Sequence, residues 1–294
     1  MVHELLREIS NEEGMKKNFA QVGEHLYVKP GQGLKIQDHR ASATRLPVVF
    51  AMGGSGSRLV HVTRDSFSKH MIPINWQPLS KYTFDAWRNL GFREFRFLID
   101  NTHRGNSISE YYGDGPNFGT NNLYSVEPKK LGSGGAVKLA LENKTIDGDF
   151  LWHQPDDMIV NYKNFPTDFA NVFLSAVNQG FEIVILCTPG TLYPYGEVID
   201  TDGKVTEFVE KPFISKDSSV GIWGMSEKAF DEVRELGSDE EIRIESTVFK
   251  KAAEKGSMCK ILIPNDYWIP VNDDPNLKKF EETVKNHANR KPKA

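Results

Sequence analysis

Between residues 47 and 187, short apolar segments that suit buried strands alternate with longer segments of helical periodicity. Such alternation is typical of an α/β fold, in which a mostly parallel sheet is flanked by helices. Ligands of these open sheets bind beyond the carboxyl ends of the strands, so a site is expected in the loops that follow them. The expected strands are Pro47–Ala51, Glu94–Ile99, Phe150–His153 and Glu182–Cys187, and the expected helices are Leu79–Leu90, Ser133–Leu141 and Phe165–Gln179.

The first of these strands runs directly into a glycine-rich loop that ends on an arginine. Gly53, Gly54 and Gly56 free the backbone to curl and to present several N–H groups to one anion. Arg58 adds a planar, permanent positive charge. We interpret the segment as a phosphate-binding loop, with a linker or an ordinary turn as the alternative. The motif GxxxxGK[ST] is absent, and the loop lacks the third glycine of a dinucleotide-binding loop.

Composition limits the classes of function. The 294 residues suffice for one large α/β domain or two smaller ones, and the formal charge of −4 argues against a nucleic-acid partner. Cys187 and Cys259 lie far apart among apolar neighbours, as expected of buried thiols in a reducing compartment. No apolar run approaches the ~20 residues of a membrane span, and the N-terminus is too charged for a secretory signal. We therefore expect a cytoplasmic protein without a membrane partner.

The two ends of the chain differ from its middle. Residues 1–45 form an N-terminal extension, with a helix-like start at Glu4–Ile9 and a strand and turn at Glu24–Gly31. This extension could cap the sheet, mediate oligomers or form an ordered arm. At the other end, Asp274–Lys291 is expected to form a polar helix that leads into a basic tail.

After Thr188 the pattern changes from alternating strands and helices to pairs of strands. The segment Gly196–Val209 is typical of a β-hairpin whose turn is Asp202-Gly203. A hairpin inserted here would form a wall of an acceptor pocket. The following segment, Val220–Met225, suits another strand.

The loop Gly53–Leu59 and the segment Lys69–Ile74 together resemble one family, the sugar nucleotidyltransferases or NDP-sugar pyrophosphorylases. In that family the first strand leads into a G-G-x-G-[ST]-R-L loop, and a K-x-x-[LM]-P-[IV] segment follows. The family's proline between the two blocks is absent here. The resemblance implies a Rossmann-like, GT-A-like nucleotidyltransferase fold over residues 46–294, with a nucleotide part (46–187), a sugar-phosphate part (188–275) and a C-terminal helix and tail (276–294).

Further blocks continue the resemblance and imply roles for individual residues. Leu131–Ala136 is similar to an L-G-[ST]-[AG]-G-A segment that lies against the base, although a helix N-terminus capped by Ser133 would look the same. Tyr195-Gly196 and Glu210-Lys211-Pro212 are similar to Y-G and E-K-P signatures, of which the second could also be a surface turn. The implied nucleotide-binding residues are Gly53, Gly54, Ser55, Gly56, Ser57, Glu127 and Gly132, and the implied sugar-binding residues are Gly196, Glu210, Lys211 and Gly221.

A metal site for this chemistry needs hard oxygen ligands, which Mg²⁺ prefers. The segment Trp152–Ile159 resembles the family's L-x-x-G-D block, which implies Asp157 as a ligand, while Asp156 stands where the family prefers glycine. Two such aspartates could also belong to an ordinary loop. The family's second ligand, an aspartate, is replaced by Pro270, so Asn272 or Asp273 is expected to substitute, as an asparagine does in the related N-acetylglucosamine-1-phosphate uridylyltransferases.

The resemblance implies a transferase that joins a nucleoside triphosphate and a hexose-1-phosphate, such as glucose or mannose, with Mg²⁺ as cofactor. Arg58, Lys69, Asp157 and Lys211 are the implied catalytic residues. The arrangement from Glu127 to Ala136 is closer to guanylyl- and uridylyltransferases than to thymidylyl enzymes. The alternatives are a catalytically impaired regulatory protein that binds nucleotide or sugar phosphate, and a structural protein. Whether the chain forms a homo-oligomer stays open, and the histidines lack the spacing of a zinc enzyme.

Overall fold

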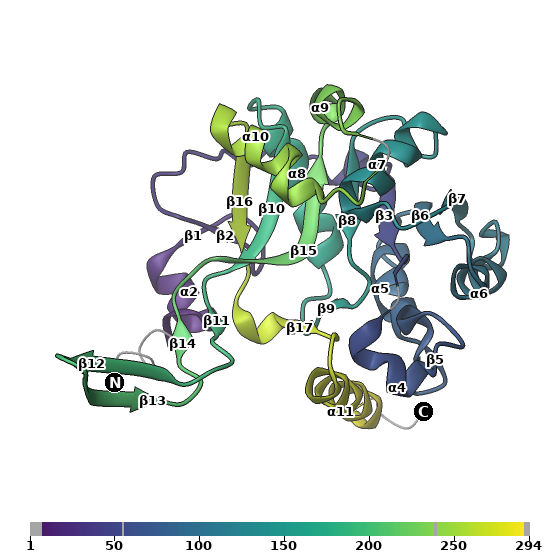
Figure 1. The fold of residues 1–294 in the computed structure, drawn as a ribbon. Coiled ribbons are helices and arrows are strands. Elements are labelled where there is room, and N and C mark those ends of the chain that lie inside the picture. The colour runs from purple at the N-terminus through teal and green to yellow at the C-terminus, as the bar shows by residue number, and fades with distance from the viewer. Residues whose placement is uncertain (1–7, 55, 238–239, 291–294) are drawn as a thin grey trace.

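A computed structural model describes residues 8–54, 56–237 and 240–290. Its centre is a nine-stranded sheet that crosses the whole molecule (Figure 1). In spatial order the strands are β1 (Ala20–Gln21), β2 (Tyr27–Val28), β16 (Met258–Leu262), β10 (Ile183–Thr188), β15 (Ser218–Met225), β8 (Phe150–His153), β3 (Val48–Ala51), β6 (Glu94–Asp100) and β7 (Asn121–Glu127).

The sheet is mixed, with most strands in one direction. β3 is parallel to β6 and β8, β6 is parallel to β7, and β10 is parallel to β16. β15 lies antiparallel between β8 and β10, and β2 is antiparallel to β16 and β1. The predicted mostly parallel sheet is therefore confirmed, and the glycine loop follows a central strand of it.

Helices cover both faces of the sheet, and alternate residues of one strand contribute to the hydrophobic cores on its two faces. The described helices are α2 (Glu12–Asn18), α3 (Arg40–Ala43), α4 (Val60–Thr63), α5 (Leu79–Arg88), α6 (His103–Tyr112), α7 (Gly132–Glu142), α8 (Phe165–Val177), α9 (Phe230–Arg234), α10 (Val248–Lys255) and α11 (Asp274–Arg290). Val48 and Phe50 of β3 belong to the core under α5, α6 and α8, while Val49 belongs to the core under α7, α9 and α10. None of these described helices has the length and apolar character to cross a membrane.

Four two-stranded sheets complete the described fold. They are β4 (Pro73–Ile74) with β5 (Gln77–Pro78), β9 (Asp157–Ile159) with β17 (Trp268–Pro270), β11 (Thr191–Leu192) with β14 (Phe213–Ile214), and β12 (Glu197–Thr201) with β13 (Lys204–Val209). The pair β9–β17 and helix α11 enclose a third, smaller core with Leu59 and Ile72.

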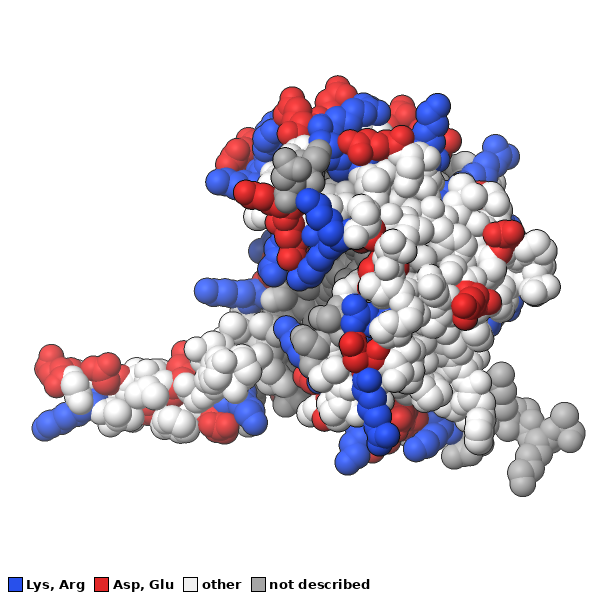
Figure 2. All heavy atoms as spheres, turned by 45° about the vertical axis from the view of Figure 1, so that its right-hand side comes forward, with Lys and Arg blue, Asp and Glu red and all other residues white. Residues whose placement is uncertain are grey.

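The hairpin β12–β13 has the predicted turn, since Asp202 and Gly203 both have positive φ (49° and 79°). It projects from the body (Figures 1 and 2), and nearly all of its residues are exposed, Val205 and Phe208 among them. In the described part of the chain no second layer packs against this hairpin, so the structure does not show the expected wall of a pocket in the body.

The N-terminal extension is an ordered arm that also extends the sheet. The predicted helix start at Glu4–Ile9 falls largely on residues outside the described part of the chain; α2 begins after Asn11, which caps it by accepting the N–H of Gly14. β2 pairs with β16 through Tyr27 and Leu262 and so covers the edge of the sheet. An edge covered in this way is protected from pairing with other chains.

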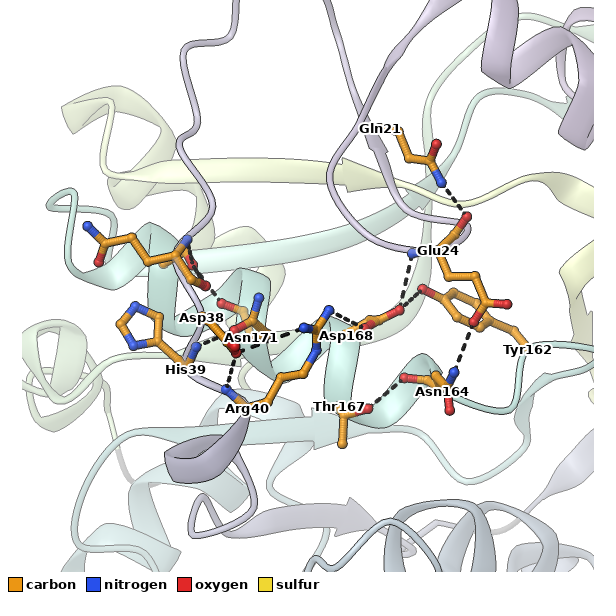
Figure 3. Close-up of polar contacts among 12 residues, drawn as sticks. Gln21, Glu24, Asp38, His39, Arg40, Tyr162, Asn164, Thr167, Asp168 and Asn171 are labelled. Carbon is orange, nitrogen blue, oxygen red and sulfur yellow. Dashed lines mark hydrogen bonds and ion pairs between the residues drawn. The ribbon is translucent and has the colours of Figure 1, made fainter.

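Polar side chains of α8 hold the rest of the arm (Figure 3). The buried carboxylate of Asp168 accepts hydrogen bonds from the N–H of Glu24 (3.1 Å) and the hydroxyl of Tyr162 (2.7 Å), and Arg40 lies 3.6 Å away. One turn further along, Asn171 accepts the N–H of His39 (2.6 Å). Backbone groups of the irregular arm thus find the partners that a regular element would have supplied.

Replacing Asp168 with alanine should destabilise the protein by about 2–4 kcal/mol, because a buried hydroxyl and a partly buried N–H would lose their acceptor. Urea unfolding followed by circular dichroism measures this change. Thr167→Ala on the exposed side of the same turn is the matched control and should alter stability by less than about 0.5 kcal/mol. Equal stability of the two variants would show that the arm is not anchored here.

Candidate active site

Two cavities lie at the carboxyl ends of the central strands, one on each side of the glycine loop. The first, of about 310 Å³, extends from the loop to the start of α7, and the second, of about 270 Å³, lies beside the 3₁₀ turn Ser57–Leu59. Figure 2 shows acidic and basic side chains of the body gathered around a hollow. The first cavity is lined by Ala51, Gly53, Gly54, Asp100, Asn101, Thr102, Arg104, Glu127, Pro128, Lys129, Lys130, Gly132, Ser133, Ala136, Trp152 and Gln154, and the second by Gly56, Arg58, Leu59, Lys69 and Asn272.

The glycine loop passes between Glu127 and Lys69, and its glycines are required for that path. Gly54 and Gly56 have φ values of 105° and 57°, which other residues rarely adopt. A Cβ at Gly53 would lie 3.2 Å from Oε1 of Glu127, and one at Gly56 would lie 3.1 Å from Cβ of Lys69. Ser55 lies outside the described residues, and of Ser57 only the backbone is described.

Lys69 connects three segments that are far apart in the sequence. Its Nζ donates to Oδ2 of Asp156 at 2.5 Å and lies 3.5 Å from Oδ1 of Asn272. Asp156 is 1% exposed, and although burial alone would raise its pKa, the Lys69 ammonium outweighs burial and holds the pKa below its usual value. The predicted lysine is therefore part of a buried ion pair that opens into the second cavity.

Short strand pairing explains why Asn272 is close to Lys69. Pro270 of β17 is the partner of Asp157 in β9, and the N–H of Val271 donates to the carbonyl of Asp156 at 2.8 Å. This pairing places the next residue, Asn272, at the second cavity. Pro270 itself offers no oxygen from its side chain, so Asn272 is the better placed of the residues considered for the second ligand.

Asp157 is closely packed between Trp268 and Gly221. Its Oδ1 accepts the indole N–H of Trp268 at 2.9 Å, and its Oδ2 lies 2.2 Å from where a Cβ of Gly221 would be. Gly221 has a φ of 70°, so both its conformation and its neighbour require glycine. Burial, and then the negative charge of Asp156, raise the pKa of Asp157 well above its usual value.

The oxygen chemistry of the two expected ligands, Asp157 and Asn272, is of the kind that Mg²⁺ prefers. Within the described ranges there is no ready cluster of three or more His, Cys, Asp or Glu side chains around one point. Mg²⁺ does not need such a cluster, because it is often held by one or two protein oxygens together with water and substrate phosphates. A buried carboxylate with a raised pKa is a group that a cation would stabilise. Asp157 is such a group, but it lines neither of the two cavities, whereas Asn272 lines the second.

Glu127 ends β7 and reaches the first cavity. Its Oε2 accepts the N–H of Leu131 at 3.1 Å, and burial, with the charges of Asp100 and Glu241, raises its pKa to about 7. The single N–H of Leu131 therefore does not offset the effect of burial on this carboxyl group.

The pKa of Glu127 makes stability depend on pH. Because the pKa is raised on folding, from 4.5 to about 7, the folded state binds more protons, and stability should fall as the pH rises through that window. Glu127→Gln keeps an acceptor for Leu131 and removes the charge, so at pH 8 the free variant should be more stable than the wild type by up to about 3 kcal/mol. Denaturant unfolding at pH 4.5 and pH 8 measures this; an equal change in stability at both values would contradict it.

Several residues of the two cavities were not predicted from the sequence. Asp100 follows a predicted strand, and the rule that sites lie at strand ends could have identified it. Its carboxylate accepts the N–H groups of Gly54 (3.4 Å) and Gly105 (3.3 Å) and lies 3.8 Å from Arg104. Trp268 belongs to the segment that resembles the family's second metal-ligand block and lines neither cavity. Its hydrogen bond to Asp157 was not predicted, because that contact depends on the pairing of two short strands.

The predicted sugar-binding residues lie in two places. Gly221 lies against Asp157, as described above, whereas Gly196 lies at the start of the hairpin, where a Cβ would meet the ring of Phe208 at 2.4 Å. Glu210 and Lys211 follow the hairpin, with side chains that are 64% and 65% exposed. They line neither of the two cavities.

A larger cavity, of about 520 Å³, lies away from the glycine loop, between α5, the start of α8 and α11. It is lined by aromatic and aliphatic side chains such as Trp87, Tyr162 and Phe280. It contains none of the predicted site residues. The predicted site residues that line a described cavity therefore lie at the two smaller ones.

A glycine loop, a lysine and buried carboxylates at the carboxyl ends of an α/β sheet define a nucleotide-binding α/β protein. The chain belongs to the nucleotidyl transferase family, whose model matches residues 46–287. The expected family resemblance is thereby confirmed.

Individual relatives are similar at low identity. A UTP–glucose-1-phosphate uridylyltransferase of Synechocystis sp. is 25% identical over 241 residues, which cover 76% of this chain and 59% of that protein. A D-glycero-alpha-D-manno-heptose 1-phosphate guanylyltransferase of Aneurinibacillus thermoaerophilus is 26% identical over 249 residues, covering 82% of this chain and 100% of that protein. The fold is similar to a structure assigned as a glucose-1-phosphate thymidylyltransferase of Bacillus anthracis, with a TM-score of 0.64, 19% identity and coverage of 82% and 95%.

Proposed function

We propose that this protein is a sugar-1-phosphate nucleotidylyltransferase, which transfers a nucleoside monophosphate from a triphosphate to a hexose-1-phosphate, such as glucose or mannose, and releases pyrophosphate. The observation that carries the proposal is the position of Lys69, which lies under the glycine loop and between Asp156 and Asn272. Family membership and relatives that are nucleotidyltransferases support it. Two buried, free cysteines suit a cytoplasmic location.

The proposed chemistry needs positioning and charge stabilisation rather than a covalent intermediate on the protein. A phosphate oxygen of the sugar phosphate attacks the α-phosphorus in line, and pyrophosphate leaves from the opposite side. N–H groups of the glycine loop hold the triphosphate, and Arg58 and Lys69 stabilise charge on its oxygens from the second cavity. Asp157 and Asn272 would hold Mg²⁺, which supplies Lewis-acid stabilisation of the phosphate charge.

The proposed site for the sugar phosphate combines Gly221 with residues of the hairpin and of the segment that follows it. Gly221 is packed against Asp157 so closely that any side chain there would clash, and it is proposed to present its backbone to the sugar. Lys211 is proposed to bind the acceptor phosphate, with Glu210 and Gly196 at the sugar. Because Lys211 is exposed after the hairpin, this role requires the segment to close over the bound sugar phosphate.

A second candidate function is that of a regulatory protein that binds nucleotide or sugar phosphate without turnover. The observation that favours it is Pro270, which stands opposite Asp157 without a side-chain oxygen. Under this alternative the cavities would still bind ligand, but Asn272 would fail to complete the metal site.

Pyrophosphate release tests the proposal. The wild-type protein, with Mg²⁺, is given each common nucleoside triphosphate, dTTP included, with a panel of hexose-1-phosphates. Release that depends on one triphosphate and one sugar phosphate is the expected result. Silence across the panel, with nucleotide binding still detected by a thermal shift, would favour the regulatory alternative.

A further inference from the structure

Asp156 is a buried carboxylate that has no role in the proposed transfer. Its side chain is 1% exposed, and its Oδ2 accepts from Nζ of Lys69 at 2.5 Å. Its other oxygen, Oδ1, accepts no hydrogen bond within the described ranges of the chain. The ring nitrogen Nδ1 of His70 lies 3.8 Å from Oδ1, which is too far for a hydrogen bond. Part of the acceptor capacity of this carboxylate is therefore unused.

The ammonium group of Lys69 occupies a position that suits a cation. Its Nζ lies between Oδ2 of Asp156 and Oδ1 of Asn272, at 2.5 Å and 3.5 Å. Lys69 and Asn272 both line the second cavity, so this position can be reached by a ligand of the cavity. Carboxylate and amide oxygens are also the ligands that Mg²⁺ prefers. The oxygens that hold Nζ could therefore hold a metal ion in its place.

The proposed transfer requires Lys69 to turn towards phosphate oxygens in the second cavity. Lys69 can do so, because its ammonium is carried on a flexible four-carbon stem and its side chain is 18% exposed. Asp156 would then be left buried without its partner, which is strongly destabilising. A divalent cation at the former position of Nζ would remove this penalty. Movement of Lys69 and binding of a metal ion would thus favour each other.

We propose that Asp156 is a ligand of the divalent cation and that Lys69 and the cation exchange places on it. In the ligand-free protein Lys69 neutralises Asp156. With metal and triphosphate bound, Asp156 and Asn272 hold the cation, and Lys69 contacts the phosphates. Asp156 thereby supplies a negative charge that Pro270 cannot supply. The inference rests on the proposed function for the role of the triphosphate, whereas the cation site itself does not depend on transfer.

Lys69→Met tests the exchange, with Mn²⁺ alone as the probe. Electron paramagnetic resonance measures the free Mn²⁺ while it is titrated into the protein without nucleotide. Because the ammonium no longer competes for Asp156, the variant should bind Mn²⁺ at least ~10-fold more tightly than the wild type. Adding Asp156→Asn to this variant should abolish the gain. A gain that persists in Lys69→Met/Asp156→Asn, or no gain in Lys69→Met, would overturn the role of Asp156.

Two controls separate this exchange from a general effect of charge and from misfolding. Arg58→Met removes the same charge from another side chain of the second cavity and should change the affinity for Mn²⁺ by less than ~3-fold. A gain as large as that of Lys69→Met would overturn the exchange. In thermal unfolding, Mg²⁺ should raise the midpoint of Lys69→Met and leave that of Lys69→Met/Asp156→Asn unchanged.

Asp156→Asn alone gives an answer even where Lys69→Met does not fold, because it leaves no unpaired carboxylate in the interior. Its amide oxygen can still accept from Lys69. Its affinity for Mn²⁺ should be at least ~10-fold weaker than that of the wild type, since the charged ligand is missing. An affinity equal to that of the wild type would overturn the proposal.

Failure of the inference and failure of the proposed function give different results. Turnover by the wild type, with binding of Mn²⁺ that Asp156→Asn leaves unchanged, would overturn the inference and leave the transferase standing. Binding of Mn²⁺ that depends on Asp156, without turnover on any hexose-1-phosphate, would support the cation site and contradict the transferase. The absence of both would overturn both.

Discussion

Replacing Lys69 with methionine should lower the turnover of the proposed transfer at least about 1,000-fold, the usual effect of removing a cation that stabilises phosphate charge. The same change should cost about 3 kcal/mol of stability, because Asp156 would be left buried without its partner. Steady-state pyrophosphate release and urea unfolding measure the two effects. Lys251→Met, which removes an exposed lysine paired with Glu235, is the control and should change neither.

A double variant separates the two effects of Lys69. In Lys69→Met/Asp156→Asn no charge is left buried, so most of the lost stability should return. Activity should not return, because the cation beside the glycine loop is still missing. Recovery of turnover together with stability would show that Lys69 serves the fold alone and would contradict its assigned role.

Replacing Asp157 with asparagine should also lower turnover about 1,000-fold or more, since a metal ion supplies several kcal/mol of charge stabilisation. The stability of the ligand-free protein, in contrast, should increase. Because burial and Asp156 raise the pKa of Asp157, stability of the wild type falls as the pH rises from the usual carboxyl range through that raised value. Asparagine keeps an acceptor for Trp268 and has no charge to bury, so the variant should be more stable at pH 8.

Two measurements check the Asp157 variant. Thermal unfolding without metal compares its midpoint with that of the wild type at pH 8. The shift of that midpoint by Mg²⁺ with nucleotide should be present in the wild type and absent in the variant. A variant that is less stable than the wild type, and that still responds to Mg²⁺, would mean that Asp157 is a structural group.

The sequence was informative wherever a local pattern determines the structure. The glycine loop after β3, the turn at Asp202-Gly203 and the helix at Asp274 follow from residue preferences that act over a few positions. The positive φ of Gly54 and Gly56 agrees with the role expected of glycines in that loop.

Contacts between distant segments could not be predicted in this way. Asp156 and Lys69 are 87 positions apart, and no periodicity in the sequence predicts that a lysine on a 3₁₀ turn pairs with a residue after β8. The position of Asn272 depends on β9 and β17, which are too short to have a sequence signature. Polar contacts with α8, rather than an apolar stripe, hold the N-terminal arm. The path of the arm could therefore not be predicted from hydrophobic periodicity.

The measurement that tests the central claim most directly follows the α-phosphate itself. The protein is incubated with Mg²⁺, a hexose-1-phosphate and a nucleoside triphosphate labelled at the α-phosphorus, and the products are separated after phosphatase treatment. The account predicts that the label moves into a phosphatase-resistant nucleoside diphosphate sugar, in an amount equal to the pyrophosphate released. Label that stays in the triphosphate before phosphatase treatment, or that appears in free nucleoside monophosphate, would contradict it.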